Sequence, residues 1–174
     1  PQGLLAIAKI PSQSLSELFS SQKGALKLAY FWEIQDPGNA GTVIRAADAF
    51  GFDGVLFSDK SVDAYSPKVV RSSAGSHWHI PIIEDVTLEA LMNAAQENGS
   101  ELYATDADAD LDLLVAAQES ASKSAIWIFG NEARGIPRDL PAKRVAIPIN
   151  GKAESLNLAT AASVVMYAVS AARK

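Results

Sequence analysis

Short segments of the sequence combine glycines with charged or amide side chains in spacings that suit ligand binding. In "DPGNAGTVIRAADAFG", residues 36–51, a Pro-Gly turn leads into a helix for which Asn39 is a suitable N-cap. Gly41 in the first turn allows another backbone or a ligand to come close. Arg45 follows one turn later on the same face, so it either points over the carboxyl edge of a sheet, where α/β proteins bind ligands, or pairs with Asp48.

Two later segments have the same character. "IWIFGNEARGIP", residues 126–137, sets Glu132 between glycines, where it could accept hydrogen bonds from a small ligand or lie solvated in a reverse turn. "VAIPINGKAESLNLATAA", residues 145–162, brings Ser155 and Asn157 to the start of a helix. Backbone donors and a side-chain amide would meet there, although Ser155 could also be a plain N-cap.

The remaining sequence predicts the elements that position these segments. Strands are expected at Leu4–Ile10, Lys27–Ile34, Val55–Ser58, His79–Ile83, Glu101–Thr105, Ala125–Phe129 and Arg144–Ile149. Helices are expected at Asn39–Phe50, Leu88–Asn98 and Ser155–Ala172. This alternation predicts an α/β fold, a mostly parallel sheet with helices on both faces. The last helix is apolar nearly all round, so it is either deeply packed or contacts another subunit.

The composition suits one domain spanning residues 1–174 and argues against several kinds of site. The chain has 174 residues, no cysteine and a net charge of −5, which leaves no thiolate or disulfide chemistry. G-x-G-x-x-G, P-loop and G-x-S-x-G motifs are absent. His77 and His79 have no carboxylate close in sequence, so we expect no metal site. No apolar run reaches transmembrane length, and we expect a cytoplasmic protein without a membrane partner.

The charge is distributed unevenly. No Lys or Arg lies between Arg71 and Lys123, whereas ten acids do: Glu84, Asp85, Glu89, Glu97, Glu101, Asp106, Asp108, Asp110, Asp112 and Glu119. The rest of the chain has fifteen basic and ten acidic side chains, a balance of +5. One part of the protein could therefore face phosphates while the other faces water, or the acids could be ordinary solvated surface.

Taken in order, these segments resemble the SpoU (TrmH-like) RNA ribose 2'-O-methyltransferases of the SPOUT superfamily. The family is marked by N-x-G-x-x-x-R, G-x-E-x-x-G, and I-P-x-x-G followed by S-L-N. The matching residues here are Asn39, Gly41 and Arg45; Gly130, Glu132 and Gly135; and Ile147, Pro148, Gly151, Ser155, Leu156 and Asn157. The stretch "RSSAGSHWHIP" also resembles the family's R-x-S-x-G segment. Here Leu158 and Ala159 replace the usual Val-Ser after S-L-N, which removes one hydroxyl.

The resemblance implies a trefoil knot near the C-terminus, a homodimer, and S-adenosylmethionine as the cofactor. By analogy the cofactor would be held by Gly130, Ile147, Ile149, Ser155 and Leu156. Many members also have a small N-terminal RNA-binding domain, which we expect to be missing from this chain. The chain's own RNA contacts would then be Arg71, Arg134 and Lys152.

The implied reaction is methyl transfer to a ribose 2'-hydroxyl, and the implied catalytic residues are Arg45, Asn39, Glu132 and Asn157. A guanidinium is a poor base, so our hypothesis is that Arg45 binds a phosphate and the developing alkoxide while the other three orient the ribose. The substrate is expected to be 23S ribosomal RNA, with tRNA as the alternative. Two alternative interpretations remain. The chain could be a knotted dimer that binds RNA without catalysis, or it could be a flavodoxin-like nucleotide-binding module.

Overall fold

One parallel sheet organises the chain. A computed structural model describes residues 3, 7–21, 24–131 and 134–173. In this part of the chain seven strands lie in the order β3-β2-β1-β6-β4-β7-β5, and every neighbouring pair is parallel. The strands are β1 (Lys27–Phe31), β2 (Gly54–Phe57), β3 (Ile82–Ile83), β4 (Glu101–Thr105), β5 (Leu111–Asp112), β6 (Ala125–Phe129) and β7 (Lys143–Ala146).

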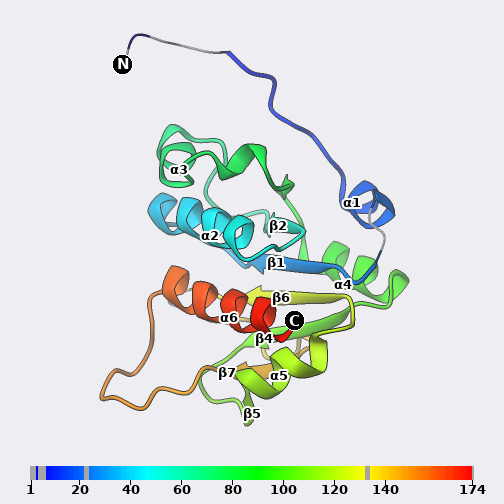
Figure 1. The fold of residues 1–174 in the computed structure, drawn as a ribbon, viewed down its shortest axis with the longest axis vertical. Coiled ribbons are helices and arrows are strands. Elements are labelled where there is room, and N and C mark those ends of the chain that lie inside the picture. Colours follow the sequence, from blue (N-terminus) through cyan, green and yellow to red (C-terminus); the bar gives the residue numbers. More distant parts are fainter. Residues whose placement is uncertain (1–2, 4–6, 22–23, 132–133, 174) are drawn as a thin grey trace.

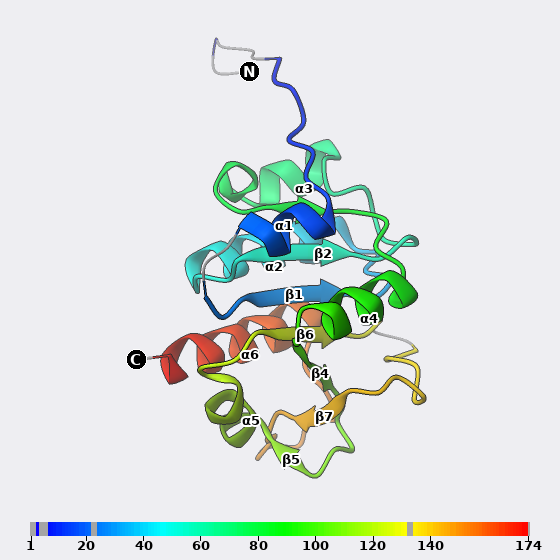
Figure 2. The ribbon, with the colours of Figure 1, turned by 90° about the vertical axis from the view of Figure 1, so that its right-hand side faces the viewer.

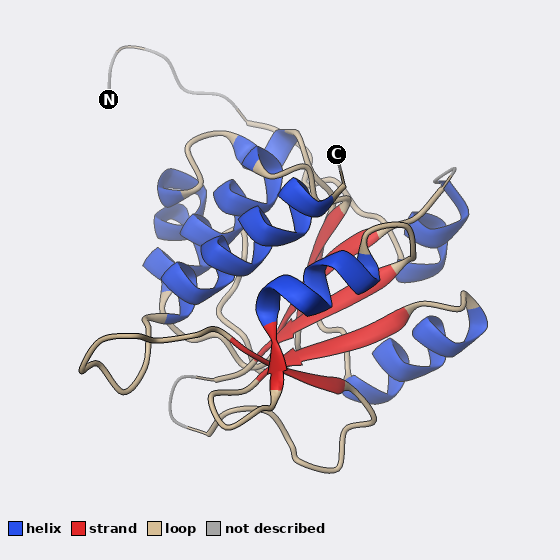
Figure 3. Ribbon diagram, turned by 60° about the horizontal axis from the view of Figure 1, so that its bottom comes forward, coloured by secondary structure: helices blue, strands red, loops and turns tan. Residues whose placement is uncertain are grey.

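Helices cover both faces of this sheet (Figures 1 and 3). One face carries α2 (Pro37–Ala49), α5 (Leu113–Ser120) and α6 (Leu158–Ala172), with α6 packed between the other two. The opposite face carries α1 (Leu15–Ser21) and α4 (Leu88–Glu97), which lie in front of the strands in Figure 2. The short helix α3 (Pro67–Ser72) and the 3-10 turn η1 (Ser76–Trp78) pack against α2. The predicted α/β class, with a parallel sheet between two helical layers, is confirmed.

The central strands are apolar because both of their faces are buried. Every residue of β1 and β6 is buried. Trp127 and Phe129 join the core beneath α2, α5 and α6, whereas Ile126 and Ile128 join the core that includes α1 and α4 residues. Successive side chains of a strand point to opposite faces, so a nearly continuous apolar run supplies two cores at once.

Some predicted elements differ from the structure. The strand expected at Leu4–Ile10 is wrong over residues 7–10, which form no strand, and Ile7 is 99% exposed; residues 4–6 lie outside the described part. Strand β1 is hydrogen-bonded on both sides, to β2 and β6, so a strand preceding it has no free place beside it. Strand β7 ends at Ala146, which leaves Ile147 and Ile149 in the loop that follows.

Because the strands are parallel, their carboxyl ends lie at one edge of the sheet. The segments after β1, β4, β6 and β7 meet at this carboxyl edge. The loop after β7 extends away from the sheet before the chain enters α6 (Figure 1). Helix α6 buries residues along most of its length, but Val164 and Tyr167 are 39% and 63% exposed. The trefoil knot that the resemblance implies stays a prediction.

Candidate active site

A cavity of about 440 Å³ opens at the carboxyl edge of the sheet. Its walls come from the ends of β4, β6 and β7, the loop after β7, and the first turn of α6. The residues predicted to hold the cofactor all line this cavity: Gly130, Ile147, Ile149, Ser155 and Leu156. Its volume lies in the range of sites for small organic ligands, which is roughly 300–1,000 Å³.

The turn after β6 forms one wall, and its glycines are required by close packing. A side-chain carbon on Gly130 would lie 2.6 Å from the backbone carbon of Gly135. Gly135 itself has a φ of 65°, a left-handed conformation that favours glycine. The Gly135 N–H donates to the Asn131 carbonyl over 2.8 Å and closes the turn. Glu132, predicted to be catalytic, lies outside the described residues.

The start of α6 forms the facing wall. Its N-cap is Asn157, whose Oδ1 accepts from the N–H groups of Ala159 and Thr160 at 2.9 and 3.3 Å. The alternative of Ser155 as N-cap is therefore wrong, since the helix begins at Leu158. Ser155 remains in the loop and faces the cavity. Ala159 is buried and supplies its backbone N–H to the cap, so this bond does not need the hydroxyl that the family usually has there.

Asn157 also joins the segment of residues 145–162 to the segment of residues 36–51. Its Nδ2 donates to Oδ1 of Asn39 over 3.2 Å, although the two residues are 118 positions apart. The prediction that Asn39 is the N-cap of α2 is wrong. Asp36 is the cap, because its Oδ1 accepts from the Asn39 N–H at 2.7 Å. The Asn39 side chain instead accepts from Asn157 at the start of α6.

Gly41 allows close packing of helices rather than contact with a ligand. A side-chain carbon at Gly41 would lie 2.6 Å from the Val69 carbonyl oxygen and 2.0 Å from Oγ of Ser72. Helix α3 therefore rests directly on the first turns of α2, and Ser72 donates to the Pro37 carbonyl over 3.1 Å.

Arg45 is exposed on α2 and does not line the cavity. Within the described residues the Arg45 side chain has no hydrogen bond or ion pair, so the alternative of an Arg45–Asp48 pair is wrong. Asp48 binds Nδ1 of His79 instead, at 2.9 Å. A hydrogen bond from Ser76, followed by that from His79, lowers the pKa of the Asp48 carboxyl. A guanidinium without a protein partner remains available to an anion.

The cations predicted to contact RNA differ in their surroundings. Arg71 at the end of α3 and Lys152 in the loop after β7 are exposed. Arg134 forms an ion pair with Glu33, a buried carboxylate that also lies 3.7 Å from Nζ of Lys60. The sequence reading did not single out Glu33.

The cavity also has lining residues that the sequence reading missed. Thr105, Asp106 and Ala107 follow β4 at the same edge. The strand was predicted with its observed bounds, Glu101–Thr105. The rule that ligands bind beyond the carboxyl ends of parallel strands would have pointed to them.

Other site types receive no support from the described residues. In residues 3, 7–21, 24–131 and 134–173 no three His, Asp or Glu side chains form a group that could hold a metal ion. His77 is buried, with its ring nitrogens 2.6 Å from Oγ of Ser73 and from the Ala64 carbonyl. The same part of the chain contains no helix with the length and apolar character needed to cross a membrane.

Solved structures share this architecture. The SpoU methyltransferase AviRb from Streptomyces viridochromogenes, in complex with AdoMet, superposes with a TM-score of 0.84 at 29% identity and covers 94% of this chain and 66% of its own. A structure described as concerning 2-OH methylation of C/U34 on tRNA gives a TM-score of 0.73 at 26% identity, covering 83% of this chain and 94% of its own.

Sequence relatives agree with the structures. The 23S rRNA (guanosine(2553)-2'-O)-methyltransferase RlmP of Bacillus subtilis (strain 168) is 35% identical over 170 residues, which cover 96% of this chain and 64% of that protein. The 23S rRNA (uridine(2479)-2'-O)-methyltransferase of Streptomyces viridochromogenes is 31% identical, with 96% and 59% covered. The chain thus spans about six tenths of these two relatives. The model of the SpoU rRNA Methylase family matches residues 28–167, and the chain belongs to this family.

Proposed function

We propose that this protein transfers a methyl group from S-adenosylmethionine to a ribose 2'-hydroxyl of RNA, with 23S ribosomal RNA as the substrate. The observation that carries the proposal is the cavity whose lining includes every residue predicted to hold the cofactor. In addition, a hydrogen bond joins two of the predicted catalytic side chains, Asn39 and Asn157, and Asn157 lines the cavity.

The residues of the cavity fit this cofactor. Ile147, Leu156 and Val145 offer an apolar surface on which an adenine ring can pack. Thr105 and Ser155 offer hydroxyl groups to ribose and amino-acid atoms. The tight approach of Gly130 to Gly135 leaves no room for a side chain at position 130 of that wall.

Bound S-adenosylmethionine would supply an electrophilic methyl group on its sulfonium. The protein must then orient the ribose hydroxyl and stabilise the charge that develops when its proton leaves. We propose that Asn39, Asn157 and Glu132 orient the ribose. Arg45 would bind a substrate phosphate and the developing alkoxide, since a guanidinium offers a planar set of hydrogen-bond donors and this side chain has no protein partner in the described residues.

RNA binding and dimerisation complete the proposal. Arg71, Arg134 and Lys152 would contact phosphates. The exposed face of α6, with Val164 and Tyr167, would pack against a second copy. Light scattering of a Tyr167→Glu variant should then report a monomer where the parent is a dimer. Because ribosomal RNA is the proposed substrate, we expect the protein to act in the cytoplasm.

A second candidate, methylation of tRNA, is favoured by the likeness to the structure concerned with C/U34 of tRNA. The reaction and the cofactor would be the same. Transfer of a labelled methyl group to purified 23S rRNA fragments and to tRNA, in parallel, distinguishes the two substrates.

The first experiment is calorimetric titration of the chain with S-adenosylmethionine, beside the variant Leu156→Arg. Leu156 lines the cavity and is 38% exposed, so the arginine should block the site while the protein still folds. Leu114→Arg is the matched control, because Leu114 is 66% exposed on α5 and is not part of the lining.

Binding by the parent and by Leu114→Arg, with loss in Leu156→Arg, supports the proposed cofactor site. Absence of binding by a parent that is folded by circular dichroism would contradict the methyl-transfer proposal. It would favour the reading of an RNA-binding protein without catalysis.

A further inference from the structure

Glu33, two residues after the end of β1, is held in an unusual conformation. Its φ is 52°, in the left-handed region that few residues other than glycine adopt. The residue is only 2% exposed, although it carries a carboxylate. A strained backbone and a buried charge at one position persist only when surrounding contacts hold them, and such positions cluster at functional sites.

The contacts of Glu33 connect segments that are far apart in the chain. Its N–H donates to Oγ of Ser58 after β2, at 2.8 Å, and its carbonyl accepts from Nδ2 of Asn131 after β6, at 2.9 Å. Its carboxylate binds the Arg134 guanidinium and lies 3.7 Å from Nζ of Lys60. Glu33 therefore joins the ends of β1, β2 and β6 at the edge that carries the cavity.

The pairing with Arg134 acts directly on the cavity wall. Arg134 precedes Gly135, which lines the cavity and closes against Gly130. The Arg134 side chain is 68% exposed, whereas that of Glu33 is 3% exposed. The fixed partner is thus the carboxylate, and the arginine is the group that it holds in place.

We propose that Glu33 is a positioning residue for the cofactor cavity. By anchoring Arg134 it keeps Gly135 against Gly130, and so maintains the wall that the cofactor must touch. The same anchor turns the guanidinium so that its remaining N–H groups face solvent, where the RNA would lie. The identity of the ligand in this inference rests on the proposed function. The role of Glu33 in holding the turn after β6 does not depend on that function.

Glu33→Gln tests the proposal, because it keeps the size of the side chain and removes the charge that holds Arg134. We expect the dissociation constant for S-adenosylmethionine, measured by calorimetry on the whole chain, to rise on the order of tenfold. Arg134→Gln should have a similar effect. The double variant should be no weaker than the weaker single variant, since both changes remove the same contact.

Lys60→Gln is the matched control. Lys60 is the other cation near the carboxylate, but its Nζ is 3.7 Å away and the residue does not belong to the turn after β6. Its loss should therefore leave the dissociation constant within about twofold of the parent value. A role for Glu33 in stability alone would lower the melting temperature and leave cofactor affinity unchanged, and that result would overturn the proposal. Additive effects in the double variant would do the same.

Amide hydrogen exchange of Gly135 gives a second measurement that needs no ligand. Its N–H donates to the Asn131 carbonyl, so it should exchange faster in Glu33→Gln and at the parent rate in Lys60→Gln. If the parent fails to bind the cofactor, the proposed function is contradicted while this measurement still decides the role of Glu33. Unchanged exchange in Glu33→Gln would then overturn the inference.

Discussion

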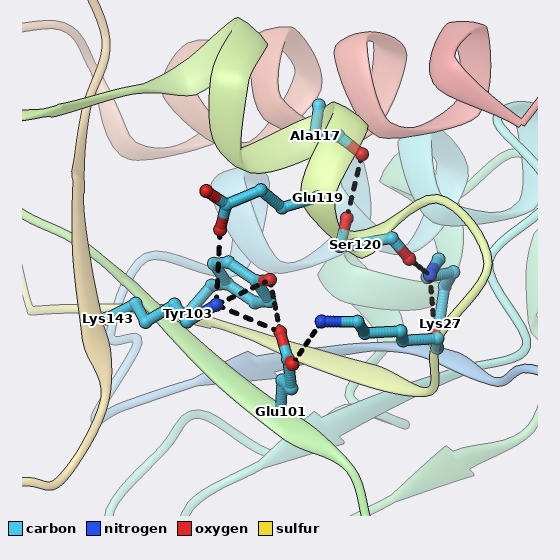
Figure 4. Close-up of polar contacts among 8 residues, drawn as sticks. Lys27, Glu101, Tyr103, Ala117, Glu119, Ser120 and Lys143 are labelled. Atoms are coloured by element: carbon cyan, nitrogen blue, oxygen red, sulfur yellow. Dashed lines mark hydrogen bonds and ion pairs between the residues drawn. The ribbon is translucent and has the colours of Figure 1, made fainter.

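The two edges of the sheet differ in what their polar residues surround. At the amino edge, charged side chains pair with one another (Figure 4). Glu101 accepts from Lys123 and Lys143 at 2.6 and 3.2 Å, and Lys143 also pairs with Glu119 at 3.1 Å. The buried Lys27 ammonium donates to two backbone carbonyls near the end of α5. At the carboxyl edge, the Glu33–Arg134 ion pair lies next to the turn that lines the cavity. Arg45 is exposed on α2, and its side chain has no partner in the described residues.

The difference separates groups that stabilise the fold from groups available to a ligand. Hydrogen bonds from Lys123 and then from Tyr103 lower the pKa of Glu101 to about 2. Burial, and then the charge of Arg173, lowers the pKa of Lys27 to about 8. Both residues have protein partners, so these shifts report structure rather than catalysis. Perturbed pKa values therefore do not mark the proposed cofactor cavity in this protein.

The largest expected effect comes from Arg45, which is exposed on α2. Arg45→Lys keeps the charge but loses the planar guanidinium, so we expect kcat/KM for RNA methylation to fall by about 100-fold. Arg173→Lys is the control at the amino edge, where Arg173 binds the Gly51 carbonyl and Asp53. Its activity should stay near that of the parent. Near-normal turnover by Arg45→Lys would remove Arg45 from the proposed mechanism.

Two glycines near the cavity provide the next contrast. Gly130→Ala would place a methyl group 2.6 Å from the Gly135 backbone, so we expect a loss of about 1–3 kcal/mol in stability from overpacking, together with weaker cofactor binding. Gly151→Ala meets no atom within 4 Å and should change neither quantity. Chemical unfolding and calorimetry measure the two effects. Equal stability and equal cofactor affinity of the two variants would contradict the close packing of Gly130 against Gly135.

The smallest effect is expected at the amino edge and depends on pH. The pKa of Glu101 is about 2 in the fold, against an ordinary value of 4.5. The unfolded chain takes up this proton first, so the stability from Glu101 is complete above about pH 4.5 and is lost as the pH falls toward 2. We expect about 1 kcal/mol, because Lys123 and Lys143 are 50% and 44% exposed.

Glu101→Gln should remove this part of the pH dependence in urea unfolding and leave the dissociation constant for the cofactor unchanged. A weaker cofactor affinity in this variant would mean that the two edges are coupled. The division between a stabilising edge and a binding edge would then have to be abandoned.

Local patterns were sufficient for the central elements. The β6 run of Ala125–Phe129 is a strand with the predicted bounds because its apolar residues serve two cores at once. The helix ends were less accurate. Asn39 and Ser155 are both suitable caps by residue type, but Asp36 and Asn157 have the position and geometry that satisfy the first N–H groups.

The sequence by itself determined the α/β class and the order of the three glycine-containing segments, because these depend on periodicity and spacing along the chain. The predicted cofactor residues came from the family resemblance of those segments, and all five line the cavity. Only the tertiary structure decided which of them meet. The Asn39–Asn157 hydrogen bond and the Glu33–Arg134 ion pair join residues 118 and 101 positions apart. Such contacts depend on strand order in the sheet, which local propensity does not encode.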